Sequence, residues 1–388
     1  MKILIVIPSF FPVKGKGGPP RSVYSLSKGI IKKGHEVVVY TTDIYDKYSR
    51  INFKKDITEI DGIKIHYFKN LIHWLAWKGI ELPPSLPGKL KKNIESFDII
   101  HANLCRNTYG FFVYYYAKKF NVPYIIQPRG SLPRMSKSNL KKFLDLIYVH
   151  SLFKNAKKII ASSEIESKQY YDVFQDLDKE KIVKIPNGIN WDQYTNLPEY
   201  TIFRKKYSIG DNRIILFIGR LHERKGADIL IKAFSRLKYD INDLKLIIAG
   251  PNDSYLNVLK NRVKKFNIQK DVIFPGPLYN RDKLEAYVSA DVFVLPSKDK
   301  YESFGNVVLE ASACGTTSVV TNVCGVTEYV KNIILVNPSV KSIEIGLRKG
   351  LREDNLGKKA RIEVKRKCGW DKVCDKYIDT YRNIVNRG

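Results

Sequence analysis

Short apolar runs alternate with amphipathic, helix-like stretches along most of the chain. Short continuous apolar runs are typical of strands in a parallel sheet that is covered on both faces. Alternation of such strands with helices predicts an α/β fold with two sheets, because the pattern starts again in the second half. The strands are expected at Lys2–Pro8, His35–Thr41, Asp61–Phe68, Phe97–Ala102, Pro123–Gln127 and Lys181–Ile185, and then at Arg213–Gly219, Leu244–Gly250, Val272–Gly276, the run ending at Pro296, and Thr317–Thr321.

A polar stretch, Trp191–Asp211, separates the two halves and contains Pro198 and Gly210, which punctuate loops. It is the best candidate for a linker, so we expect a first domain over residues 1–190 and a second over 191–368. The tail, 369–388, has apolar residues spaced by three and four, which predicts an amphipathic helix packed on another part of the protein.

The stretch Tyr301–Gly315, Y-E-S-F-G-N-V-V-L-E-A-S-A-C-G, carries the clearest candidate chemistry. It places Glu302 just before a predicted helix and Glu310 inside it. The loop entering the helix offers free backbone N–H groups at the positive end of the helix dipole, which suits a phosphate. Ionised carboxylates only accept hydrogen bonds, and sugar hydroxyls supply adjacent donors. The stretch therefore predicts a site for a sugar–phosphate compound; the alternative is two solvated helix glutamates.

Two other loops follow predicted strands. The first contains Gly17 and Gly18 and lets the backbone approach a ligand, although it lacks the third glycine of a dinucleotide fingerprint. A plain mobile loop is the alternative. In the second, Arg220 and Lys225 flank a loop before a helix, which suits a diphosphate, and no Walker pattern is present.

Polar residues also follow the strands of the first half, where ligands bind in parallel sheets. His101, Asn103 and Arg129 would lie at these strand ends. A lone histidine at such a position is more often structural than catalytic.

The chain has 388 residues, of which 44% are hydrophobic, so it can build real cores. No apolar run is long enough to span a membrane. Five cysteines without a C-x-x-C pair favour a reduced, cytoplasmic setting over a disulfide framework.

The net charge of +28 comes from 67 basic and 39 acidic residues and is spread over both halves. Such a charge attracts nucleotides, acidic glycans, nucleic acid or anionic lipid without choosing among them. The segment Arg134–Lys158 interleaves basic and apolar residues. It is either a basic amphipathic helix that lies on an anionic membrane or a domain helix with a solvated face.

Six motifs occur together in a fixed order: the Gly17-Gly18 loop, I-P-N-G-I-N, G-R-L-H-E-R-K-G, A-G-P, E-S-F-G-N-V-V-L-E-A and the W-D-K-V tail. In these motifs the chain resembles the family-4 retaining glycosyltransferases over nearly its whole length. The resemblance implies the GT-B fold, with two Rossmann-like domains facing a cleft and a C-terminal helix that returns to the first domain.

The resemblance also implies a metal-independent transfer from a nucleoside-diphosphate sugar, UDP more readily than GDP, to a glycan or lipid-linked hydroxyl in cell-surface polysaccharide or glycolipid synthesis. Lys225, Arg220 and Glu302 would be the catalytic residues, with the two cations on the diphosphate and Glu302 on the donor sugar. Glu310 would bind the ribose. The rest of the donor site would comprise Gly17, Gly18, Ser303, Phe304, Gly305 and Asn306.

His101, Arg129 and Asn187 are the acceptor or accessory candidates. Many relatives have His-Gly where this chain has Arg129-Gly130, and arginine cannot serve as a base, although it can hold an acidic acceptor or a phosphate. The single D-x-D, Asp176-Leu177-Asp178, lies outside any predicted site loop, so no metal is expected. The alternatives are a sugar-nucleotide epimerase of the same fold and a non-catalytic protein that binds anionic lipid or nucleic acid. The expected location is the cytoplasm, either free or at the inner face of the membrane.

Overall fold

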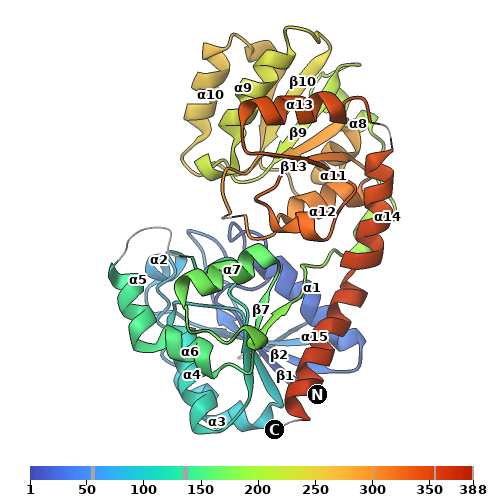
Figure 1. Ribbon diagram of the computed structural model, residues 1–388. Helices are drawn as coiled ribbons and strands as arrows, with labels where there is room; N and C mark the ends of the chain where they lie inside the picture. The colour runs from blue at the N-terminus through green and yellow to red at the C-terminus, as the bar shows by residue number, and fades with distance from the viewer. Residues whose placement is uncertain (54–56, 134–138, 301, 354, 387–388) are drawn as a thin grey trace. The chain divides into compact units, whose positions relative to one another are not determined.

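The computed structural model describes residues 1–388 except 54–56, 134–138, 301, 354 and 387–388 (Figure 1). Tyr301 and the beginning of the predicted segment Arg134–Lys158 therefore lie outside the described residues. The chain divides into two compact units. The first contains residues 1–188 together with the C-terminal residues from Trp370 onward, and the second contains residues 189–369.

The first unit is built on an eight-stranded sheet with the order β3-β4-β2-β1-β5-β6-β7-β8. Neighbouring strands are parallel except β3, which runs antiparallel to β4. The strands are β1 (Lys2–Val6), β2 (Glu36–Thr42), β3 (Thr58–Ile60), β4 (Ile63–Phe68), β5 (Ile99–Ala102), β6 (Tyr124–Ile126), β7 (Lys158–Ala161) and β8 (Ile182–Lys184).

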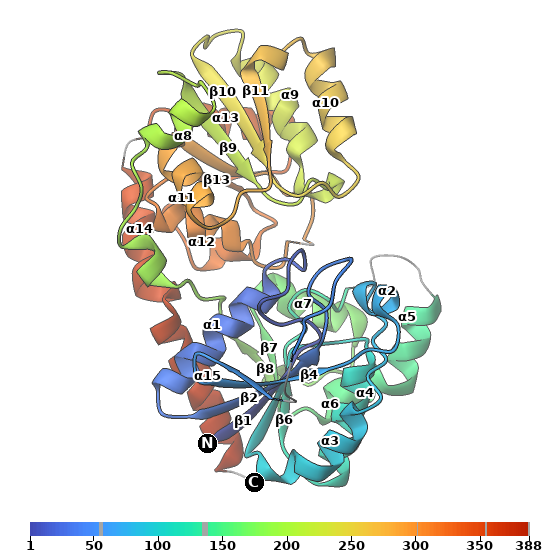
Figure 2. The ribbon, with the colours of Figure 1, turned by 180° about the vertical axis from the view of Figure 1, so that it is seen from behind.

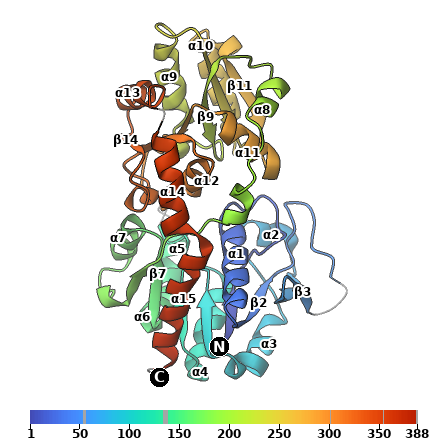
Figure 3. The same cartoon turned by 90° about the vertical axis from the view of Figure 1, so that its right-hand side faces the viewer.

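Helices cover both faces of this sheet, as its continuous apolar strands require. On one face the buried core contains residues of α1 (Pro19–Lys32) and α15 (Trp370–Val385). These two helices lie side by side (Figure 3), and a Cβ atom at Gly29 would be only 2.3 Å from Cys374 Sγ. The opposite core contains residues of α3 (Leu86–Asn93), α4 (Thr108–Lys119), α6 (His150–Asn155) and α7 (Glu164–Val173).

The second unit has a six-stranded, fully parallel sheet with the order β11-β10-β9-β12-β13-β14 (Figure 2). Helices α9, α10 and α13 contribute to the core on one face, and α11, α12 and α14 to the core on the other. The elements are β9 (Arg213–Ile218), α9 (Ala227–Leu237), β10 (Leu244–Ala249), α10 (Leu256–Lys265), β11 (Val272–Gly276), α11 (Asn280–Ser289), β12 (Val292–Leu295), α12 (Asn306–Ala313), β13 (Thr317–Thr321), β14 (Ile334–Val336), α13 (Val340–Gly350) and α14 (Leu356–Cys368).

Besides strands β3 and β14, which were not expected, the structure differs from the sequence-based expectation in two polar segments. The described part of the predicted basic helix is divided into α5 (Asn139–Leu144), the π-helical turn η2 (Asp145–Val149) and α6, and it ends in a strand, β7. The predicted linker forms a short helix of its own, α8 (Thr201–Lys206), whose Phe203 is buried in the core of the second unit. In both cases a few apolar residues within a polar stretch determine the local structure.

Candidate functional site

The acidic loop of the second unit joins β12 to α12 and is held firmly against its neighbours. Gly305 begins the helix with φ of 103°, and a Cβ atom there would lie 3.0 Å from Leu295 Cδ2. Phe304 is buried, and its carbonyl accepts a hydrogen bond of 2.7 Å from the Val326 N–H. The expected entry into a helix at Phe304–Asn306 is therefore present, with a backbone conformation that favours glycine.

The loop after β9 lies directly on the exit of β12. Gly226 has φ of 73°, and a Cβ atom at this position would be 1.9 Å from the Pro296 carbonyl oxygen. The Lys298 N–H also donates to the Arg224 carbonyl at 2.9 Å. Only a glycine permits this close approach of two backbones, and it brings Lys225 next to the acidic loop.

Lys225 and Glu302 form an ion pair, and both side chains are mostly buried, with 22% and 15% exposed. Two of the predicted catalytic residues are thus in contact. A lysine ammonium has three donors, so it can keep this carboxylate and still contact a phosphate oxygen. Burial, together with the charge of Glu302, raises the pKa of the nearby Cys324 thiol to about 12, which keeps this thiol protonated and unreactive at neutral pH.

Glu310 lies on α12 and has two partners that the sequence did not mark. Lys283 forms an ion pair with its Oε2, and the Tyr287 hydroxyl donates to the same oxygen at 2.9 Å. Tyr287 is fully buried, and burial, with the charge of Glu310, raises the pKa of its hydroxyl well above the usual value. The available sequence signal was the spacing of Lys283 and Tyr287, which places both on one face of a helix.

Arg220, the other predicted catalytic cation, follows β9 but forms its ion pair elsewhere. Its guanidinium lies 3.4 Å from the Asp253 carboxylate, and its side chain is 52% exposed. The structure therefore shows Lys225 in contact with the acidic loop and Arg220 in contact with the loop after β10.

The glycine-rich loop of the first unit has the expected form. Gly17 has φ of 79°, and Gly18 precedes Pro19 at the start of α1. Just before these glycines, the Lys16 ammonium donates to the Trp77 carbonyl and lies 4.2 Å from the centre of the Trp77 ring. Burial raises the pKa of the neighbouring Glu81 carboxyl to about 7. Lys16 and Trp77 thus hold this loop against the segment that follows β4.

Arg129 forms hydrogen bonds with two asparagines beyond the carboxyl ends of strands in the first sheet. Its Nε donates to Asn103 Oδ1 at 2.7 Å, and one terminal nitrogen donates to Asn187 Oδ1 at 3.4 Å. Its backbone has φ of 50°, a strained value for a residue with a side chain. The structure thus brings together Arg129 and Asn187, two of the three acceptor or accessory candidates.

His101, the third candidate, is fully buried. Its Nδ1 lies 2.8 Å from the hydroxyl of Tyr381 on α15. Burial first, and then the charge of Arg129, lowers the pKa of His101 well below the usual value, so the ring is neutral. This environment favours a structural role that joins β5 to α15.

The D-x-D sequence lies on the surface of the first unit after α7. Asp176 pairs with His150 at 2.8 Å, and Asp178 accepts from the Glu180 N–H at 2.9 Å. Within the described ranges, no three His, Cys, Asp or Glu side chains gather where they could hold a metal ion. Over the same ranges, no helix combines the length and the apolar character that crossing a membrane requires.

Two family descriptions match most of the chain. Residues 16–193 match Glycosyltransferase Family 4, and residues 199–366 match Glycosyl transferases group 1. An uncharacterized glycosyltransferase of Methanocaldococcus jannaschii is 30% identical over 339 residues, which cover 83% of this chain and 80% of that protein. A GDP-mannose-dependent phosphatidylinositol monomannoside mannosyltransferase of Mycolicibacterium smegmatis is 30% identical over 141 residues, 35% of this chain and 37% of that one.

Solved structures show the same fold over the whole chain. HepE of Anabaena, in complex with UDP and glucose, has a TM-score of 0.77 at 18% identity and covers 99% of this chain and 100% of its own. Sucrose-phosphate synthase of Thermosynechococcus elongatus has a TM-score of 0.76 at 20% identity, with 100% of both chains covered.

Proposed function

Because the chain belongs to the family-4 glycosyltransferases and has the GT-B fold, we propose that it is a retaining enzyme that uses a nucleoside-diphosphate sugar. The acceptor is the hydroxyl of a glycan or a lipid-linked sugar, in cell-surface polysaccharide or glycolipid synthesis. The observation that carries this proposal is the contact of Lys225 with Glu302 at the loop that begins α12.

In this proposal, α12 and its entry loop hold the donor. Glu310 accepts hydrogen bonds from the ribose, Glu302 accepts from the donor sugar, and Ser303–Asn306 directs backbone N–H groups at phosphate and sugar. The ion pair seen here would then loosen as the diphosphate competes for the Lys225 ammonium.

Cleavage of the anomeric C–O bond leaves negative charge on the nucleoside diphosphate. The Lys225 ammonium and the N-terminal dipole of α12 stabilise that charge, and Arg220 adds a second cation when it releases Asp253. The bonding electrons leave with the diphosphate. The acceptor hydroxyl attacks the sugar from the same face, and its proton passes to the departing diphosphate oxygen. We assign no divalent metal to this step and no enzymic nucleophile.

UDP is the preferred donor nucleotide in this proposal. It is supported by the fold shared with HepE, whose structure contains UDP. GDP is the alternative, because the mycobacterial relative is named as GDP-mannose-dependent.

A donor screen with a Glu310→Ala variant tests the function. The wild type is expected to bind and slowly hydrolyse a UDP-sugar in EDTA, measured by calorimetry and UDP release. Glu310→Ala is expected to raise the donor KM about 10-fold to 100-fold, as loss of hydrogen bonds to a charged acceptor predicts. Glu199→Ala, at an exposed surface glutamate, is the matched control and should leave KM unchanged.

Other results of the screen would contradict the proposal. Interconversion of the donor sugar without an acceptor would indicate an epimerase. Failure to bind any nucleotide sugar would support a non-catalytic protein that binds lipid or nucleic acid. Loss of turnover in EDTA would overturn metal independence.

The proposed location is the cytoplasm, at the inner face of an anionic membrane. Exposed apolar side chains on α4, α5 and η2 of the first unit support this contact, and exposed lysines accompany them. Basic amphipathic surfaces bind anionic membranes because their apolar side chains insert into the lipid and their lysines are attracted to the anionic headgroups. The side chains are Phe111, Tyr115, Phe143, Leu146 and Ile147, with Lys118, Lys119 and Lys142.

Flotation with phosphatidylcholine vesicles, with and without phosphatidylserine, tests this surface. The wild type is expected to float only with the anionic lipid, and the double variant F143E/L146E is expected to remain in the soluble fraction. Tyr239→Glu replaces an exposed aromatic residue of the second unit and should float as the wild type does. Equal flotation of all three proteins would rule out this surface.

A further inference from the structure

Two side chains of α11 converge on one oxygen of Glu310. Lys283 and Tyr287 are four residues apart, so they lie on the same face of the helix. The Lys283 ammonium pairs with Glu310 Oε2, and the Tyr287 hydroxyl donates to Oε2 at 2.9 Å. The Lys283 side chain is only 18% exposed, and Tyr287 is fully buried.

This arrangement leaves the other oxygen of the carboxylate for a ligand. Among the described residues, no hydrogen bond to Glu310 Oε1 is formed, and the side chain is 24% exposed. A carboxylate whose one oxygen is fixed from inside the protein presents its second oxygen in a defined direction. This second oxygen has two lone pairs, so it can accept hydrogen bonds from two neighbouring hydroxyls.

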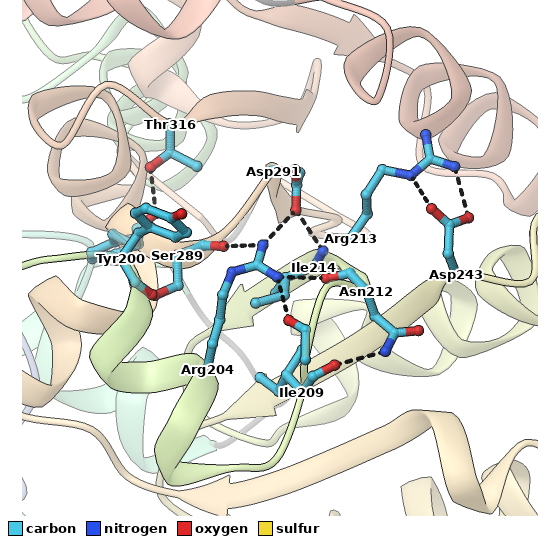
Figure 4. A network of polar contacts seen from close by, with 12 residues as sticks. Tyr200, Arg204, Ile209, Asn212, Arg213, Ile214, Asp243, Ser289, Asp291 and Thr316 are labelled. Atoms are coloured by element: carbon cyan, nitrogen blue, oxygen red, sulfur yellow. Dashed lines mark hydrogen bonds and ion pairs between the residues drawn. The ribbon is translucent and has the colours of Figure 1, made fainter.

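The last turn of α11 is held by hydrogen bonds to its backbone, so the helix that carries Lys283 and Tyr287 is fixed in place. The Thr316 hydroxyl donates to the Tyr287 carbonyl at 2.7 Å, and Arg204 donates to the Ser289 carbonyl at 3.2 Å. The Ser289 hydroxyl donates in turn to the Tyr200 carbonyl at 2.6 Å. Figure 4 shows this network, in which Arg204 of α8 also reaches Asn212 just before β9.

The surroundings of Glu310 also indicate that Lys283 and Tyr287 orient its carboxylate. Glu310 also lies near the partly buried Cys314, whose thiol pKa is raised to about 12 by burial and by the charge of Glu310. A mostly buried lysine and a buried tyrosine on the same oxygen therefore serve to fix its direction.

We propose that Lys283 and Tyr287 are positioning residues that hold Glu310 for the vicinal hydroxyls of the donor ribose. This inference rests on the proposed function, because it takes Glu310 as the ribose-binding group. Neither residue contacts the reacting atoms in this scheme. Their contribution is to donor affinity through Glu310 and not to the chemical step.

Calorimetric binding of UDP and of 2′,3′-dideoxy-UDP to Lys283→Met and Tyr287→Phe variants tests the proposal. Each variant is expected to weaken UDP binding about 5-fold to 20-fold, as loss of a hydrogen bond to a charged group predicts. Neither should change the affinity for the dideoxy nucleotide, which lacks the hydroxyls. Combined with Glu310→Ala, neither should cause a further loss. Lys260→Met, at an exposed lysine of α10, should bind both nucleotides as the wild type does.

Three outcomes overturn the inference. A UDP affinity unchanged by both variants would remove the positioning role. An equal loss for UDP and for the dideoxy nucleotide, in variants with wild-type melting temperatures, would show that the residues act elsewhere. If Lys283→Met does not fold, Tyr287→Phe carries the test alone, since it removes one hydroxyl. A wild type that binds neither UDP nor GDP would instead refute the proposed function itself, and the inference with it.

Discussion

Lys225→Ala is expected to lower kcat about 100-fold to 1,000-fold, the range measured when one preorganised donor to a developing charge is removed. The ammonium lies beside Glu302 at the start of α12, where the proposed leaving diphosphate gains its charge. The donor KM should change much less, because the interaction strengthens as the bond breaks. Steady-state transfer assays with the donor from the screen measure both constants.

The matched control is Lys232→Ala, at an exposed lysine of α9, the helix that follows Lys225. It removes the same charge from the same unit and should leave both constants unchanged. Removing Lys225 also leaves a mostly buried carboxylate without its partner, so melting temperatures must accompany the kinetics. A wild-type kcat in folded Lys225→Ala would refute leaving-group stabilisation by this residue.

Gly226→Ala is expected to destabilise the second unit by at least about 2 kcal/mol, from backbone strain at positive φ together with a steric clash. The added methyl group would lie 1.9 Å from the Pro296 carbonyl oxygen, a backbone atom that cannot move aside as a flexible side chain would. Relief of the clash must separate the loop after β9 from the exit of β12. Denaturant unfolding should therefore show a lower midpoint, and transfer activity should fall as Lys225 moves away from Glu302.

Gly210→Ala provides the comparison. Gly210 also has positive φ, 62°, but no atom lies within 4 Å of the added Cβ. The Gly210→Ala variant should lose about 1 kcal/mol of unfolding free energy, because only the backbone strain is added. Its activity should be unchanged. Equal unfolding midpoints for the two variants would show that contact with Pro296 contributes nothing.

Much of the architecture was predictable because apolar periodicity reports burial. The runs beginning at Lys2 and Arg213 became central strands of two separate sheets, and the two α/β units of the GT-B fold are confirmed. The position of Glu302 before a helix and of Glu310 inside it followed from local signals alone. Gly305 marks the helix start, and Gly315 follows its C-terminal cap.

Contacts between distant segments were not predictable in this way. Nothing in the sequence near Glu310 indicates Lys283 or Tyr287, because a neighbouring helix brings them in through packing. His101 looked like a strand-end candidate, yet Tyr381 encloses it from far along the chain. The strand β7 was missed because its few apolar residues follow a helix without a turn signal. Arg220 and Lys225 looked equivalent in the sequence. The close approach of Gly226 to Pro296 brings Lys225 to Glu302, whereas Arg220 pairs with Asp253.

The covering of the first sheet by α15 has a consequence for biosynthesis. Strands β1 to β8 leave the ribosome long before residues 370–385, whose Val373, Cys374, Tyr377 and Tyr381 complete the core on one face. During translation α1 covers part of that face, but the part under α15 stays exposed while the entire second unit is made. The nascent N-terminal half therefore exposes apolar surface that favours aggregation until the final helix docks.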